Sequence, residues 1–183
     1  MNGNLEKTEI NIPNNWLSSG YFVYVAHINY GDKNFKYIGQ TGDNKHQTAR
    51  GPLYRIGGHL SKLKSSKQNQ IIKGIRNNIL KGNDSHEKLE QVLSKINLKY
   101  TFWKIADFDY NDTKEEHSLK RKKTQFIEHY LIYHLHKKID LFNQKAKTDI
   151  TKNSKLFFKD KCVGLTKDAN EILKELGYYS LED

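Results

Sequence analysis

Five side chains along this sequence combine the chemistry needed to bind an anion and to move a proton: Tyr24, Tyr37, Arg55, His59 and Glu128. An arginine is a permanently charged fork that matches phosphate oxygens. A phenol has a pKa of about 10, so neighbouring cations must lower that pKa before it takes a proton from water. A carboxylate is a hard ligand for a divalent metal. Together such groups could hydrolyse a phosphodiester, which requires an activated water and stabilisation of negative charge.

A β-hairpin is expected to position the two tyrosines. Tyr21–Ile28 is dense in β-branched and aromatic residues, which predicts a buried strand. The polar segment Asn29–Asn34 contains Gly-Asp and predicts a turn, and Phe35–Gln40 predicts the returning strand. The hairpin therefore places Tyr24 and Tyr37 on adjacent strands.

The segments that follow predict several helices and a third strand. Leu53–Leu63 has helical character, but each glycine of Gly57-Gly58 costs a helix about 1 kcal/mol. Either this helix starts late, or another group approaches its backbone closely. Periodicity, capping signals and β-forming residues predict helices at Asn69–Leu80, Ser85–Ile96 and Thr113 to about Lys138, a strand at Leu98–Ala106, and in the tail a strand near Leu156–Phe158 and a helix at Thr166–Leu176.

Glu128 lies in the most apolar part of the long predicted helix. Phe126–Leu135 is apolar nearly all round, which predicts burial. The helical neighbours of this glutamate are Thr124, Leu131, Ile132 and Leu135. A carboxylate in such surroundings is costly unless a cation or hydrogen-bond donors satisfy it. A metal ion and a buried salt bridge are the two alternatives.

Five short segments, taken in order, resemble the GIY-YIG nuclease superfamily: YFVYV, KYIGQT, RIGGH, FIEHY and LFN. The second hallmark triplet is present as Tyr37-Ile38-Gly39, whereas Phe22-Val23-Tyr24 keeps only the tyrosine of the first. The family carries an arginine after the hairpin, a tyrosine or histidine one helical turn later, a glutamate on a later helix and then an asparagine. The matching positions are Arg55, His59, Glu128 and Asn143. The resemblance covers roughly Tyr21 to Asn143, apart from an unmatched stretch at about Lys64 to Ile96.

The resemblance implies a role for each matched residue. Glu128 would bind one Mg²⁺ (or Mn²⁺), and Arg55 would hold the phosphate. Tyr24 would take the proton of the attacking water, because Arg55 and the metal favour its phenolate, and His59 would accept or relay that proton. Tyr37 would hold the water or the phosphate through its hydroxyl group.

The resemblance leaves the roles of two further residues open. Asn143 would orient the region of Glu128 or the DNA backbone, and its alternative is a plain loop asparagine. Arg50 is a rival for the catalytic arginine, but only Arg55 is followed by a histidine one helical turn later.

The charge of the chain favours a polyanionic partner. Lys and Arg total 31 against 21 Asp and Glu, a net charge of +10. Such an excess attracts nucleic acid through counterion release, so double-stranded DNA is the expected partner. The candidate contacts to the DNA backbone are Lys62, Lys64, Lys67 and Lys73. The run Lys120-Arg121-Lys122-Lys123 fits either a phosphate-contacting face or a solvated helix turn.

Structural interpretations remain open for most of these residues. The tyrosines could be strand aromatics of the core, and Arg55 and His59 could form a solvated helix face. The three histidines of the long helix are poorly spaced for zinc: His129, His134 and His136. The lone Cys162 is expected to be a small buried hydrophobic residue.

The sequence predicts an α/β (α+β) fold with a small three-stranded antiparallel or mixed sheet flanked by helices. Residues 1–18 are expected to form a lead-in. Residues 19–145 would form the nuclease-like domain, with a helical insertion at about 64–96, and residues 146–183 a C-terminal extension of it. A single cysteine, no secretory signal and no apolar run of about 20 residues predict a cytoplasmic protein without a membrane span.

The resemblance is strongest to stand-alone type II restriction endonucleases of the superfamily, which predicts metal-dependent cleavage of DNA. A palindromic site would imply a homodimer, since two-fold DNA calls for two-fold protein. The alternatives are an inactive nucleic-acid-binding domain of the same fold, a homing or repair nuclease, and a protein-interaction module.

Overall fold

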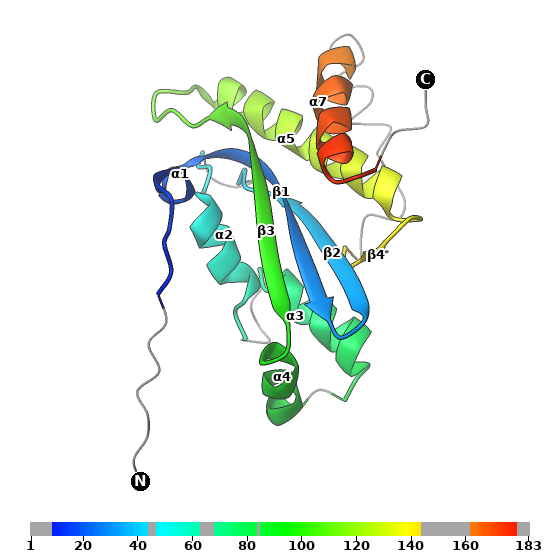
Figure 1. Cartoon of the computed structure of the whole chain (residues 1–183). Helices are drawn as coiled ribbons and strands as arrows, with labels where there is room; N and C mark the ends of the chain where they lie inside the picture. Colours follow the sequence, from blue (N-terminus) through cyan, green and yellow to red (C-terminus); the bar gives the residue numbers. More distant parts are fainter. Residues whose placement is uncertain (1–8, 44–46, 63–67, 84, 144–161, 179–183) are drawn as a thin grey trace.

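A four-stranded sheet forms the centre of the computed structural model, which describes residues 9–43, 47–62, 68–83, 85–143 and 162–178 (Figure 1). The strands are β1 (Gly20–Tyr30), β2 (Lys33–Gln40), β3 (Asn97–Asp107) and β4 (Asp140–Leu141), in the order β3-β1-β2-β4. β1 is antiparallel to β2 and β3, and β4 is parallel to β2. The predicted α/β class is confirmed, and the short β4 adds a fourth strand to the three expected.

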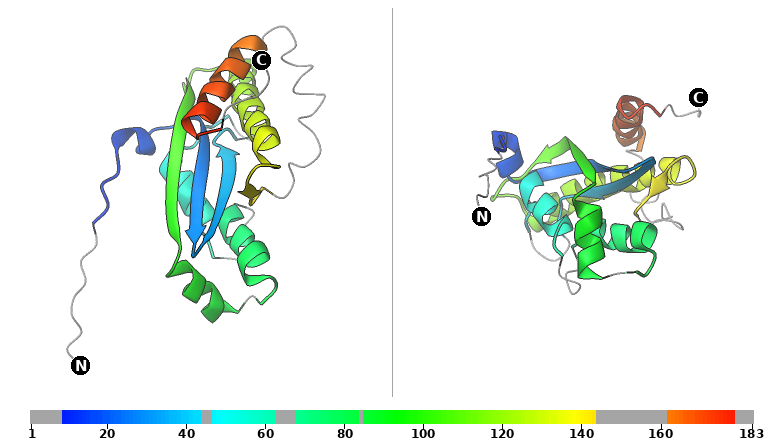
Figure 2. Two further views of the ribbon diagram at one scale, coloured as in Figure 1. Left: turned by 45° about the vertical axis from the view of Figure 1, so that its right-hand side comes forward. Right: turned by 60° about the horizontal axis from the view of Figure 1, so that its bottom comes forward.

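Helices cover both faces of this sheet. They are α1 (Asn14–Leu17), α2 (Pro52–His59), α3 (Gln70–Ile75), the π-helical η1 (Arg76–Leu80), α4 (His86–Leu93), α5 (Lys114–Leu135) and α7 (Cys162–Glu175). In the right-hand view of Figure 2, α7 lies on one side of the sheet, and α3 and α4 lie on the other. None of the helices in the described ranges is long and apolar enough to cross a bilayer.

The long helix α5 begins where the sequence predicts. The Thr113 hydroxyl accepts a hydrogen bond from the Glu116 amide, and the Glu116 carboxylate accepts one from the Thr113 amide. This capping box satisfies two of the amide groups that a helix start leaves unpaired. Two hydrogen bonds thus fix the start of the helix that carries Glu128.

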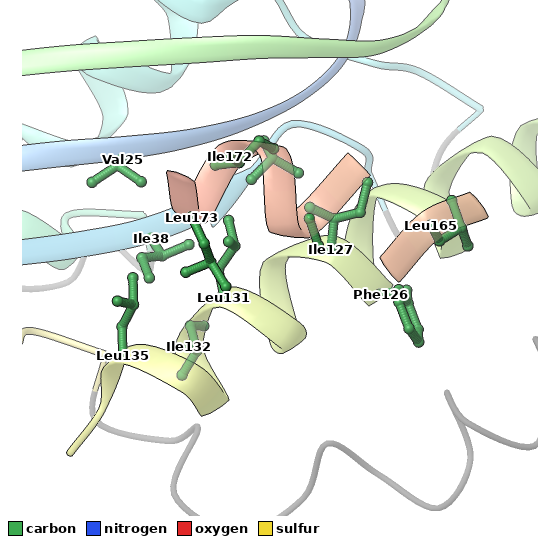
Figure 3. Packing of buried hydrophobic residues seen from close by; sticks show 12 residues of the cluster. Val25, Ile38, Phe126, Ile127, Leu131, Ile132, Leu135, Leu165, Ile172 and Leu173 are labelled. Carbon is green, nitrogen blue, oxygen red and sulfur yellow. The ribbon is translucent and has the colours of Figure 1, made fainter. Parts of the chain in front are cut away.

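One face of the sheet packs against α5 and α7 (Figure 3). Val25 and Ile38 of the sheet meet Leu131 of α5 and Leu173 of α7, and all four are buried. Because shortening one such leucine to alanine costs about 2–5 kcal/mol, this layer fixes the path of α5 across the sheet.

The other face carries Tyr24 and Tyr37, because side chains alternate along a strand. Helices α3 and α4 cover part of this face with the buried residues Ile71, Ile72, Ile75, Leu89 and Val92. These helices come from the stretch at about 64–96 that is predicted as an insertion. The stretch therefore contributes to a core of the same domain.

The segment after the hairpin differs in detail from the prediction. The helix expected at Leu53–Leu63 begins at Pro52 and ends at His59, directly after the glycine pair. The end of the Gln68 side chain lies so close to Gly58 that it would have to shift to admit a Cβ there. The expectation that another group approaches this backbone is confirmed at Gly58, whereas a Cβ at Gly57 would meet nothing within 4 Å.

Other differences concern the following helix and the two ends of the chain. The helix expected at Asn69–Leu80 is α-helical only to Ile75 and continues as η1. The lead-in contains α1, and the Trp16 ring lies 5.4 Å from the Phe102 ring. The C-terminal helix is confirmed, although α7 starts earlier than predicted, and the strand expected near 156–158 lies outside the described residues.

Candidate active site

The hairpin register brings Tyr24 and Tyr37 onto one face of the sheet. Tyr24 pairs with Gly39 and Tyr37 pairs with Ala26, so the two phenols lie diagonally, with ring centroids 6.2 Å apart. Both side chains are buried. A Cβ at Gly39 would collide with the ring and the hydroxyl of Tyr24. The glycine of the Tyr37-Ile38-Gly39 triplet is therefore required because the Tyr24 side chain lies across its backbone.

Helix α2 directs Arg55 and His59 at the Tyr24 hydroxyl. His59 Nε2 lies 2.5 Å from this oxygen, and Arg55 Nη2 donates a hydrogen bond to it over 3.4 Å. Residues four apart share one face of a helix, which is why a single short helix can supply both groups. His59 is buried, whereas Arg55 remains partly exposed.

The hydrogen bonds around Tyr24 assign a neutral imidazole to His59. Because a guanidinium can only donate, Tyr24 accepts from Arg55. The Tyr24 hydroxyl donates its proton to His59 Nε2 in the neutral tautomer that carries its proton on Nδ1. Burial and the charge of Arg55 lower the pKa of His59 from 6.5 to about 3. His59 is therefore uncharged at neutral pH and can accept a proton from Tyr24.

Both phenols are protonated at neutral pH. Burial raises the pKa of Tyr24 to about 12, although Arg55 and a hydrogen bond with Tyr37 act to lower it. Burial also raises the pKa of Tyr37 well above its ordinary value. Further positive charge beside Tyr24 would lower its pKa toward the neutral range.

Glu128 belongs to the same cluster, although α5 packs mainly on the other face of the sheet. Its charge acts on Arg55, Tyr24 and Tyr37. The Arg121 side chain of α5 lies against Gly42, so α5 passes close to the end of β2. The helix can therefore supply a carboxylate to the tyrosine face of the sheet from its edge.

The carboxylate of Glu128 makes no hydrogen bond or ion pair with any residue in the described ranges. Burial raises the pKa of Glu128 from 4.5 to about 7, and the charge of Arg55 acts in the opposite direction. A partly buried carboxylate usually has a bonded partner. Glu128 is thus free to bind a cation.

Asn143 is hydrogen-bonded to β2, the strand that carries Tyr37. Its side-chain amide accepts from the Ile38 amide over 2.9 Å and donates to the Ile38 carbonyl over 2.7 Å. These two bonds continue the pairing of β2 beyond the two residues of β4. Asn143 therefore fixes the backbone of β2 next to Tyr37.

Arg50, the rival for the catalytic arginine, has other partners. Its Nη2 lies 3.2 Å from Asp43 Oδ2, and its guanidinium lies 4.6 Å from the centre of the Tyr54 ring. The geometry therefore favours Arg55, which contacts Tyr24 directly.

The lysines expected to contact DNA are only partly described. Lys62 is exposed and pairs with Glu90 over 2.6 Å, and Lys73 is partly buried on α3. Lys64 and Lys67 lie outside the described residues. In the basic run of α5, Lys120 pairs with Asp112 over 2.7 Å. DNA contact by these residues stays a prediction.

No group of three or more His, Cys, Asp or Glu side chains in the ranges that the structure describes is placed to hold a metal ion. No such group is formed by His129 and His134 of α5 or by His136, which directly follows this helix. The side chain of Cys162 lies outside the described residues, so its predicted burial is not tested. Metal binding by Glu128 stays a prediction.

Two aromatic residues of β3 complete the cluster and were not singled out from the sequence. The Tyr24 ring lies 5.0 Å from the Phe102 ring and 6.3 Å from the Tyr100 ring. Their spacing of two within a predicted strand places them on one face. Which face that is depends on the register between β3 and β1, which the sequence does not show.

Five of the six predicted site residues thus share one cluster, and Asn143 holds the strand beside it. No protein-family model, no curated protein and no solved structure matches this chain.

Proposed function

We propose that this chain is a metal-dependent DNA endonuclease in which Tyr24, Tyr37, Arg55, His59 and Glu128 act on one phosphodiester. The observation that carries the proposal is the convergence on the Tyr24 hydroxyl, to which Arg55 donates and from which His59 accepts. The unpaired carboxylate of Glu128 interacts electrostatically with Arg55 and Tyr24. Packing alone would require neither a guanidinium nor an unpaired carboxylate next to a buried phenol.

Arg55 is the residue that would bind the scissile phosphate. Its Nε is buried and makes no hydrogen bond within the described part of the chain. Guanidinium donors match two phosphate oxygens in a fork. A bound phosphate would therefore satisfy a donor that the free protein leaves unpaired.

Tyr24 and His59 would move the proton of the attacking water. As the water oxygen bonds to phosphorus and the bond to the leaving oxygen breaks, the water proton passes to Tyr24, and the Tyr24 proton passes to His59. The negative charge of the phosphate would offset the effect of Arg55 and so raise the pKa of His59. Substrate binding therefore makes His59 a better base than it is in the free protein.

Glu128 is the residue that would hold a divalent cation, Mg²⁺ or Mn²⁺. The fit is supported by its unpaired carboxylate, since Mg²⁺ commonly uses one or two protein carboxylates and takes other ligands from water and phosphate. When bound, the cation would stabilise negative charge on the phosphate and the leaving oxygen.

Within this class, we infer a site-specific type II restriction endonuclease. The net charge of +10 supports double-stranded DNA as the partner. The single cysteine supports a cytoplasmic location, and a palindromic site would require a homodimer.

A non-catalytic nucleic-acid-binding domain is the second candidate. It is favoured by the resting pKa values of the proton-transfer pair, about 12 for Tyr24 and about 3 for His59. Efficient acid–base catalysts commonly have pKa values close to the working pH.

Digestion of unmethylated plasmid DNA distinguishes the two candidates. With Mg²⁺ we expect discrete fragments, and with EDTA or with Glu128→Ala we expect none. Glu115→Ala, an exposed glutamate of the same helix, is the matched control and should cut normally. DNA retention without nicking in every reaction would support the second candidate and refute the first.

A further inference from the structure

A third tyrosine, Tyr100 of β3, lies on the same sheet face as Tyr24 and Tyr37. The register places Tyr37 and Tyr100 on either side of Ala26. Tyr24 occupies the next position of the central strand on that face. Three adjacent strands therefore each supply one phenol to the cluster.

The hydroxyl of Tyr100 is buried and makes no hydrogen bond with any residue that the structure describes. Its ring is fixed by stacking on Phe102, with centroids 5.8 Å apart and an interplanar angle of 18°. Burial raises the pKa of Tyr100, Tyr24 adds to that effect, and the charge of Arg55 opposes it. The group is therefore a protonated donor within electrostatic reach of Arg55.

Unpaired buried hydroxyl groups are rare because they are destabilising. In this cluster three such atoms occur together: the Tyr100 hydroxyl, Arg55 Nε and His59 Nδ1. A guanidinium can only donate, and a protonated phenol donates readily. The missing partner of each of these two donors is therefore an acceptor, and an anion with several oxygens can accept from more than one donor.

We propose that the Tyr100 hydroxyl donates a hydrogen bond to a second oxygen of the phosphate that Arg55 binds. This inference rests on the proposed function for the identity of the anion, a nucleic-acid phosphate, and it holds for a cleaving and for a non-cleaving domain. Tyr100 is then a substrate-binding residue that the GIY-YIG resemblance does not mark.

Thermal unfolding of Tyr100→Phe tests whether the Tyr100 hydroxyl lacks a partner in the DNA-free protein. The variant keeps the ring and loses only the hydroxyl group, so its Tm should equal that of the wild type or exceed it by a few degrees. Tyr30→Phe is the matched control, because Tyr30 lies on the same sheet face as Tyr100 but at the hairpin end of β1. A Tm of Tyr100→Phe several degrees below that of the wild type would overturn the proposal, because it would show that the hydroxyl already has a partner.

Fluorescence anisotropy with a labelled DNA duplex, in EDTA, tests the bound state. We expect Tyr100→Phe to bind about tenfold more weakly than wild type, because a hydrogen bond to a charged group is lost, and Tyr30→Phe to bind normally. An unchanged Kd for Tyr100→Phe would overturn the proposal. Weaker binding by this variant, with a wild type that cuts no DNA, would support the phosphate contact and reject the nuclease function. If the wild type cuts DNA and Tyr100→Phe binds and cuts it as the wild type does, the nuclease function would be supported and the phosphate contact of Tyr100 rejected.

Discussion

Glu128→Gln is expected to stabilise the metal-free protein at pH 8 and to leave its stability nearly unchanged at pH 4. Burial raises the pKa of Glu128 in the folded protein from 4.5 to about 7. Between these two values the folded state holds a proton that the unfolded state has lost. The wild-type free energy of unfolding therefore falls as the pH rises through this window, and the contribution is constant above it.

The rise in the pKa of Glu128 sets the size of the effect. At about 1.4 kcal/mol per pKa unit, the raised pKa of Glu128 lowers the free energy of unfolding by at most about 3 kcal/mol. The side chain is partly exposed, so we expect a gain of about 1–3 kcal/mol for Glu128→Gln at pH 8. For a chain of this length, that corresponds to a Tm increase of roughly 2–10 °C.

Urea unfolding at pH 4, 6 and 8 in EDTA measures this difference, with Glu171→Gln on the exposed side of α7 as the control. A second series contains Mg²⁺. A cation that binds Glu128 stabilises the wild type by about 2.7 kcal/mol at a hundred times its Kd, and it should not stabilise Glu128→Gln.

A Glu128→Gln variant less stable than the wild type at pH 8 would refute this reasoning. It would mean that the carboxylate forms a structural ion pair with Arg55, whose loss from a buried site costs about 3–5 kcal/mol.

Three further predictions test other residues of the candidate site and of the strand that carries it. Gly39→Ala should lower the free energy of unfolding by about 1–3 kcal/mol in urea titrations, because the new Cβ enters the space of Tyr24; wild-type stability would contradict this. Asn143→Leu should cost about 1–2 kcal/mol and speed amide hydrogen exchange at Ile38, whose two backbone groups lose their partner. The His59 imidazole should stay neutral in NMR titrations from pH 5 to 8, because its pKa is about 3, and a midpoint near 6.5 would count against it. The stability linked to His59 should fall as the pH drops from 6.5 toward 3.

The hairpin and the long helix are predictable because their signals are local. The β-branched and aromatic residues of β1 and the Gly-Asp turn lie within a few residues of each other, and so do the two partners of the Thr113–Glu116 capping box. The cost of burying Glu128 is also visible in the sequence, since its apolar neighbours lie on the same helix.

Contacts between distant segments explain what the sequence does not show. The two residues of β4 pair with β2 across about a hundred positions, and Gln68 reaches Gly58 from another segment. Tyr100 joins the cluster only through the register of β3 on β1, which shifts between Tyr21 and Phe22. A periodicity analysis places Tyr100 on one face of its strand but cannot tell which face meets Tyr24.

The most direct test of the shared cluster is the single-turnover rate of Mg²⁺-dependent plasmid cleavage by Tyr24→Phe, which removes one hydroxyl and keeps the ring. We expect a rate about a hundredfold or more below that of the wild type, because the acceptor of the water proton is lost. Cleavage by Tyr24→Phe at the wild-type rate would contradict the assignment of the chemistry to this hydroxyl and to the residues that converge on it.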